Sequence, residues 1–146
     1  MNRDFIEMLH ALSDAGADFL VVGAHALAAH DQPRATEDLD LWVRPSPENA
    51  PKVWHALASF GAPLDELTLE DLFTPELVFQ IGMKPYRIDI ITTIDGVTFD
   101  EAWPNRILVN QYGVTYGVIG RDDLIRNKIA AGRPKDLVDV DNLKSQ

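Results

Sequence analysis

Apolar residues in the first half of the chain recur with the periods of helices and strands. The first of them, from Phe5 to Leu12, recur at helical spacing and predict a helix, and Gly16 stands where this helix would end. Residues 18–23 form a short apolar run that predicts a buried strand. The Ala-rich residues 24–30 then predict a helix that starts directly after Gly23. Residues 37–43 alternate acidic and apolar side chains, which is the pattern of a strand.

The same two periods predict a helix, several strands and two closing helices in the rest of the chain. Pro47 suits a helix start, and residues 48–60 predict a helix that ends at Gly61. The other expected strands are residues 76–81, 86–92, 107–109 and 114–119, and the other expected helices are residues 99–103, 122–131 and 135–143. Residues 82–85 give the first two of these strands a hairpin-length connection.

This order of elements predicts one α+β domain over residues 1–146, with a mixed β-sheet and helices packed on one side. No repeat or long linker divides the chain. No stretch approaches the ~20 apolar residues that span a membrane, and the N-terminus lacks the apolar core of a signal peptide. We therefore expect a cytoplasmic protein without a membrane partner. The absence of cysteine excludes disulfides and thiolate metal sites.

The net charge of −10 arises from 23 acidic residues against 13 Lys and Arg. Such a field repels a polyanion, so the composition disfavours a protein that binds nucleic acid over a broad surface. Most of the acids are expected to keep the surface hydrated.

Three aspartates stand out because they lie inside otherwise apolar strands. Asp38 and Asp40 are two residues apart, so both carboxylates leave the same face of their strand. Asp89 lies between two isoleucines of a later strand and adds a third carboxylate if the two strands pair in a suitable register. Like charges repel unless something offsets them, and a hard divalent cation does so. The cluster predicts one or two Mg²⁺ ions, or Mn²⁺; singly, each Asp could also belong to the wet face of an exposed strand.

Gly23 and Ala24 lie between a predicted strand and a predicted helix. A glycine there permits close backbone approach, and the following helix N-terminus offers N–H groups to a phosphate. The alternative is a tight turn with no ligand.

This pattern resembles the DNA polymerase β-like nucleotidyltransferase superfamily. That family's signature is an apolar residue, Gly, then Gly or Ser, a spacer, and then Asp, apolar, Asp or Glu, apolar, with a third acid on a later strand. Gly23 and Ala24, the Asp38 and Asp40 pair, and Asp89 match it in order.

The segment before the acids narrows the resemblance. Arg34 and Thr36 precede Asp38 and Asp40 in the Arg-x-Thr-x-Asp-apolar-Asp arrangement of small bacterial nucleotidyltransferases. These include relatives of the abortive-infection toxins of type IV toxin–antitoxin systems. Residues 127–143 resemble the C-terminal segment of the same proteins, in which a Lys and an Arg-x-Lys-Asp element approach the site.

The resemblance implies a nucleotidyltransferase-like sheet and an Mg²⁺-dependent transfer of a nucleotidyl group from a nucleoside triphosphate (NTP) to a hydroxyl, with release of pyrophosphate. The acceptor would be a protein, an RNA or a small molecule, and a partner protein could help to form the site. Asp89 would help to activate the hydroxyl. The implied metal-binding and catalytic residues are Asp38, Asp40 and Asp89, and the implied nucleotide-binding residues are Gly23, Ala24, Arg34, Thr36, Lys128, Arg133 and Lys135.

One departure from the family keeps a second function open. Ala24 lacks the hydroxyl of the serine that the family often has at this position, so backbone N–H groups would have to bind the phosphate in its place. The alternative is a catalytically weak or inactive nucleotidyltransferase-like partner or regulator, for instance in a toxin–antitoxin pair. A plain α+β domain with surface acids is a third option.

Several of the polar side chains also have ordinary explanations. Lys128 and Lys135 would be solvated helix residues, and Asp136 and Asp139 would solvate or cap the last helix. His25 would line the nucleotide pocket or simply pack against its neighbours.

Overall fold

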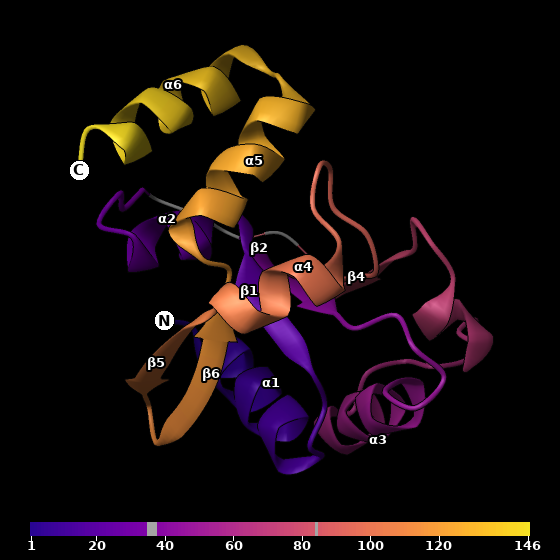
Figure 1. The fold of residues 1–146 in the computed structure, drawn as a ribbon. Helices are drawn as coiled ribbons and strands as arrows, with labels where there is room; N and C mark the ends of the chain where they lie inside the picture. Colours follow the sequence, from indigo (N-terminus) through magenta and orange to yellow (C-terminus); the bar gives the residue numbers. More distant parts are fainter. Residues whose placement is uncertain (35–37, 84) are drawn as a thin grey trace.

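The computed structural model describes residues 1–34, 38–83 and 85–146 (Figure 1). In this part of the chain six strands form one mixed sheet, in the order β3-β4-β2-β1-β6-β5. The strands are β1 (Phe19–Val22), β2 (Asp38–Val43), β3 (Val78–Ile81), β4 (Arg87–Ile91), β5 (Ile107–Gln111) and β6 (Val114–Val118). The helices are α1 (Arg3–Asp14), α2 (Gly23–Ala29), α3 (Ala50–Phe60), α4 (Phe99–Ala102), α5 (Arg121–Ala131) and α6 (Pro134–Lys144), with 3₁₀ turns at Glu70–Phe73 and Trp103–Asn105. The predicted α+β class with a mixed sheet is confirmed.

The sheet combines hairpins with crossover pairs. β3 and β4 are antiparallel neighbours, as are β5 and β6, and each pair is a hairpin in the chain. β1 lies antiparallel to β2 and parallel to β6. β2 and β4 pair in parallel, so two strands far apart in sequence lie side by side in the interior of the sheet.

Alternation along β2 and β4 divides the sheet into two faces. Leu39 and Leu41 of β2 and Ile88 and Ile90 of β4 are at most 1% exposed and face the hydrophobic core. The residues between them face the other side. Fully burying an aliphatic side chain stabilises the fold by about 1.5–3 kcal/mol, so the register of these strands is strongly determined.

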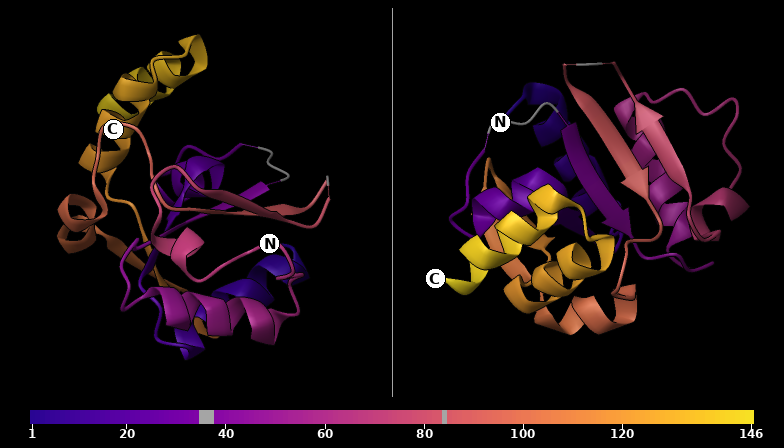
Figure 2. Two further views of the ribbon diagram at one scale, coloured as in Figure 1. Left: turned by 90° about the vertical axis from the view of Figure 1, so that its right-hand side faces the viewer. Right: turned by 90° about the horizontal axis from the view of Figure 1, so that it is seen from above.

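Helix α1 covers the core side together with α3 (Figure 2). Asn2 caps its N-terminus: the side-chain oxygen accepts a hydrogen bond of 2.8 Å from the backbone N–H of Asp4. Its apolar residues recur at helical spacing and are buried; they are Phe5, Met8, Leu9 and Leu12. The helix expected at the start of the chain is therefore confirmed.

Helices α5 and α6 follow one another in the chain and pack against each other. The pair lies at the opposite end of the molecule from α1 and α3 in Figures 1 and 2. The prediction that helices pack on one side of the sheet therefore holds for α1 and α3. Helices α5 and α6 form a separate pair that this prediction did not include. No described helix combines the length and the apolar character that a membrane span needs.

Two strand boundaries differ by two residues from those expected, for local reasons. β3 starts at Val78 because Glu76 has a φ of 63°, a left-handed conformation that cannot belong to a strand. β5 continues to Gln111 because its last two residues, though polar, pair with Thr115 and Val114 of β6. Backbone pairing across a hairpin does not depend on apolar side chains.

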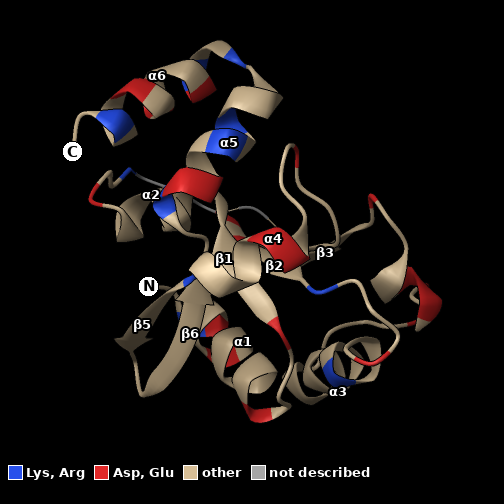
Figure 3. Cartoon of the chain, in the orientation of Figure 1, with Lys and Arg blue, Asp and Glu red and all other residues tan. Residues whose placement is uncertain are grey.

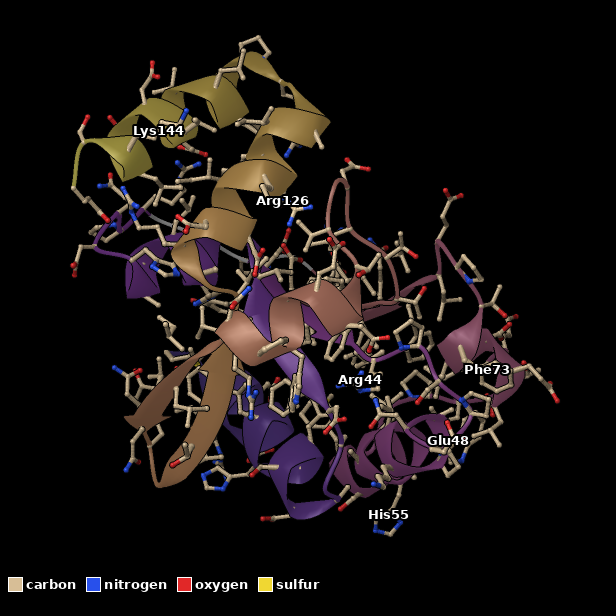
Figure 4. The ribbon with its side chains drawn as sticks, in the orientation of Figure 1. Arg44, Glu48, His55, Phe73, Arg126 and Lys144 are labelled. Atoms are coloured by element: carbon tan, nitrogen blue, oxygen red, sulfur yellow. The ribbon has the colours of Figure 1, made fainter. Side chains whose placement is uncertain are left out.

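Arg44 anchors the far end of β2. Its Nε donates a 2.8 Å hydrogen bond to Asp18 Oδ2, and its guanidinium carbon lies 4.7 Å from the centre of the Phe99 ring. Figure 4 shows Arg44 in the region between α4 and α3. The strand that carries Asp38 and Asp40 is therefore fixed at the end opposite to these two acids.

Candidate functional site

The parallel pairing of β2 with β4 brings the three aspartates together. Asp40 lies directly opposite Asp89, and Asp38 lies directly opposite Arg87. Residues directly opposite each other point to the same face, and Asp38 and Asp40 share a face by alternation. All three carboxylates therefore leave the face of the sheet opposite to that of Leu39, Leu41, Ile88 and Ile90.

Gly23 places the backbone against this cluster. It ends β1 and opens α2 with a φ of 71°, a conformation that side chains rarely adopt. A Cβ atom at this position would lie 2.3 Å from Asp40 Oδ2. The glycine is required both for the turn and for the close approach of Asp40, and the half-buried Ala24 follows directly in α2.

Arg87 belongs to the same face and did not figure among the residues expected from the sequence. Its Nη2 donates a hydrogen bond of 3.2 Å to Asp38 Oδ2, and its Nε lies 3.3 Å from Asp89 Oδ1. One guanidinium thus bridges two of the three acids. The sequence does contain a signal for this position of Arg87, because a strand residue two positions before Asp89 must point to the same face as Asp89.

The surroundings of Asp40 make its carboxyl group hard to ionise. Burial raises the pKa of Asp40 to about 6, and the nearby charges of Asp89 and Asp38 push the pKa in the same direction. Burial also raises the pKa of Asp89, against the opposing effect of Arg87. Two adjacent carboxyl groups with raised pKa values are typical of sites that bind cations or exchange protons.

We expect the pH dependence of stability to report this arrangement. The folded pKa of Asp40 is about 6 against an ordinary 3.8, so between these values the folded state binds more protons than the unfolded state. Stability should therefore rise as the pH falls from 7.5 to 5.0 in metal-free buffer, by about 1–3 kcal/mol. Urea unfolding measures this, and Asp40→Asn should remove most of the gain. An equal gain in both proteins would contradict the assignment.

The donors suit a hard divalent cation, but their arrangement here does not yet form a metal site. The oxygen atoms of Asp38, Asp40 and Asp89 are the ligands that Mg²⁺ prefers, and Asp89 Oδ1 is buried without a hydrogen bond to any described residue. Nevertheless, among the described residues no group of three or more Asp, Glu or His side chains is placed so that it could hold a metal ion. Arg87 contacts two of the three acids.

Lys128 lies in a second charged cluster, between α5 and α6. Its Nζ is 2.9 Å from Asp139 Oδ2 and 3.5 Å from Asp136 Oδ1. Asp136 and Asp139 are 1% and 3% exposed. The ordinary explanation of these residues as solvated side chains is therefore wrong for all three, because they form a buried ionic network.

Arginines complete this network. Arg133 holds Asp136 through two hydrogen bonds, from Nε to Oδ2 at 2.6 Å and from Nη2 to Oδ1 at 3.2 Å. The backbone N–H of Arg133 also donates to Asp136 Oδ2, so Asp136 caps α6 as expected. Arg34, from the segment before β2, forms an ion pair with Asp139. Figure 3 shows acidic and basic residues side by side on α5 and α6.

The other residues singled out in the sequence take varied positions. Lys135 is exposed on α6, and Thr36 lies outside the described residues. His25 is half-buried with its ring edge-on to that of Phe5 at 5.6 Å, and burial lowers its pKa. His30 packs inside the protein, with Nε2 2.8 Å from the carbonyl oxygen of Ile119. Arg34, Lys128 and Arg133 are thus brought together, each in contact with an acid of α6.

Comparisons with known proteins show likeness in structure alone. No family model matches the chain, and no curated protein matches it. TM1012 from Thermotoga maritima, assigned as a nucleotidyltransferase, superposes with a TM-score of 0.63 at 13% identity, over 99% of this chain and 92% of that chain. The lincosamide antibiotic adenylyltransferase LnuA, solved with lincomycin bound, superposes with a TM-score of 0.59 at 12% identity, over 99% of this chain and 97% of that chain. The chain therefore has a nucleotidyltransferase-like fold over nearly its whole length.

Proposed function

We propose that this protein transfers a nucleotidyl group from an NTP to a hydroxyl acceptor and releases pyrophosphate. The observation that carries the proposal is the parallel register that sets Asp40 opposite Asp89, with Asp38 on the same face and the Gly23 backbone against Asp40. A shared fold with an adenylyltransferase supports it.

In the proposed reaction the acceptor oxygen forms a bond to the α-phosphorus, and the bond from this phosphorus to the bridging oxygen of pyrophosphate breaks. Asp89 receives the hydroxyl proton, a role favoured by burial that raises its pKa. The backbone of Gly23 and Ala24 lies against the triphosphate. We include Mg²⁺ in the proposal, with Mn²⁺ as a substitute, held by Asp38, Asp40 and Asp89; a bound divalent cation supplies positive charge to the phosphate oxygens.

We propose a small-molecule hydroxyl as the first acceptor class to test. LnuA, whose structure holds the small molecule lincomycin, is matched over 97% of its own length, so it has little chain beyond what is present here. The net charge of −10 is unfavourable for an RNA acceptor. A protein side chain and an RNA end are the other classes that the experiment must separate.

Calorimetry with Mg²⁺ and each NTP tests the nucleotide site. We expect binding by the wild-type protein and no detectable binding by Asp38→Asn/Asp40→Asn, because the double variant removes two of the three charges that the site uses. The matched control is Asp14→Asn/Asp65→Asn, which removes two exposed acids outside the cluster and should bind as the wild type does. No binding by the wild type at millimolar NTP would sink the proposal.

Label transfer separates an enzyme from a binding protein. The protein is incubated with α-³²P-labelled NTP and, separately, with the small-molecule, protein and RNA fractions of a cell extract. Label that appears in the small-molecule fraction and is lost in Asp89→Asn supports the proposed reaction and acceptor. The alternative, an inactive partner protein such as a member of a toxin–antitoxin pair, predicts NTP binding without label in any fraction.

A further inference from the structure

Arg87 contacts two members of the carboxylate cluster, Asp38 and Asp89. It comes from β4, two residues before Asp89 and directly opposite Asp38 in the parallel pair. Its guanidinium donates to Asp38 at 3.2 Å and approaches Asp89 at 3.3 Å. A cationic side chain of the protein itself therefore already contacts two of the three acids.

The surroundings make this contact electrostatically significant. The side chains of Arg87, Asp38 and Asp89 are 25%, 30% and 13% exposed, so water screens their charges only in part. One guanidinium charge offsets part of the repulsion among three carboxylates that share a sheet face. The cluster can consequently exist without a bound ion.

The contact between Arg87 and Asp89 is nevertheless incomplete. Arg87 Nε and Asp89 Oδ1 are both buried, and neither makes a hydrogen bond of good geometry to a described residue. The two atoms attract each other as charges at 3.3 Å without the alignment that a strong hydrogen bond needs. A small divalent ion, which has no such directional requirement, can offer Asp89 a better partner.

We infer that Arg87 is the resident cation of the carboxylate cluster, and that it must release Asp38 and Asp89 before a divalent ion can bind there. The inference rests on the proposed function for its metal. It accounts for the absence of a ready metal site among the described residues, although the right donors share one face. Arg87 thereby sets the concentration of free metal at which the site fills.

A titration with Mn²⁺ alone, followed by the electron paramagnetic resonance signal of the free ion, tests the inference. Arg87→Gln should bind Mn²⁺ at least about tenfold more tightly than the wild type, because a competing positive charge is gone. Arg3→Gln removes the same charge from a side chain that is 90% exposed and should bind as the wild type does. Adding Asp38→Asn/Asp40→Asn to Arg87→Gln should abolish the binding.

A second measurement uses the wild-type protein and does not depend on how the variants fold. The ¹⁵N-labelled arginine Nε–H signals are followed by NMR during a titration with Mg²⁺. The signal that is missing in Arg87→Lys identifies Arg87. We expect it to shift or broaden over the concentration range in which the metal binds, because the guanidinium leaves both carboxylates.

The outcomes separate this inference from the proposed function. If Arg87→Gln binds Mn²⁺ no more tightly than the wild type, or if the Arg87 signal is unchanged at saturating Mg²⁺, the inference is overturned while NTP binding still supports the nucleotide site. If neither protein binds Mn²⁺, the inference is overturned and the metal is removed from the proposed function. Absence of NTP binding in calorimetry with tighter Mn²⁺ binding in Arg87→Gln would instead sustain the inference and overturn the proposed function.

Discussion

Replacing Lys128 with methionine is expected to lower the free energy of unfolding by about 3–5 kcal/mol. The Lys128 ammonium contacts Asp139 at 2.9 Å and Asp136 at 3.5 Å, and both acids are buried between α5 and α6. Methionine fills a similar volume but leaves two buried carboxylates short of a cation, which is far more costly than loss of a surface ion pair. Urea unfolding followed by far-ultraviolet circular dichroism measures the change.

Lys135→Met is the matched control. Lys135 is exposed on α6, so its replacement should change the free energy of unfolding by no more than about 0.5 kcal/mol. Replacing a buried acid as well, in Lys128→Met/Asp139→Asn, should recover part of the lost stability because one unpaired charge is removed. If Lys128→Met is as stable as the wild type but no longer binds NTP, the lysine serves the ligand and its stabilising role is disproved.

Gly23→Ala is the second change with a large expected effect. The new Cβ would meet Asp40 Oδ2 at 2.3 Å, and a φ of 71° is itself unfavourable for alanine. Asp40 must move, and a displacement of about 1 Å at a reacting centre costs on the order of a hundredfold in rate. We expect the proposed nucleotidyl transfer to fall by about that factor and the stability to fall by about 2–4 kcal/mol.

Gly16→Ala isolates the contribution of the contact with Asp40. Gly16 has the same φ of 71°, but a Cβ there would meet no atom within 4 Å. Its replacement should cost only the conformational preference, about 1–2 kcal/mol, and leave nucleotidyl transfer unchanged. Equal losses of stability and activity in the two variants would show that the close approach to Asp40 does not matter.

Most of the fold follows from short-range patterns. The helical spacing of Phe5, Met8 and Leu12 predicted α1, and the alternation around Asp38 and Asp40 predicted β2. The structure confirms both elements. Each one buries a single face, and the buried residues are the apolar ones that recur in the sequence pattern. The boundaries of the elements were less predictable. Glu76 has a left-handed backbone conformation, so β3 starts after it, and the spacing of hydrophobic residues does not indicate such a conformation.

The candidate site was only partly accessible to sequence reasoning. The shared face of Asp38 and Asp40 follows from alternation alone, whereas the place of Asp89 depended on how β2 and β4 pair. Spacing alone does not single out Arg87, because a basic residue in a strand is usually a solvated one; its position opposite Asp38 is defined only when the register is known.

The sequence by itself determined the α+β class, the approximate elements and the common face of Asp38 and Asp40, because hydrophobic periodicity and strand alternation are visible in it. Only the tertiary structure decided which charges meet. It paired Arg87 with Asp38 and Asp89, and it enclosed Lys128 with two aspartates of α6. Such contacts depend on strand register and helix packing between distant segments, and the free energy of a charge depends on the partners and burial that those long-range contacts create.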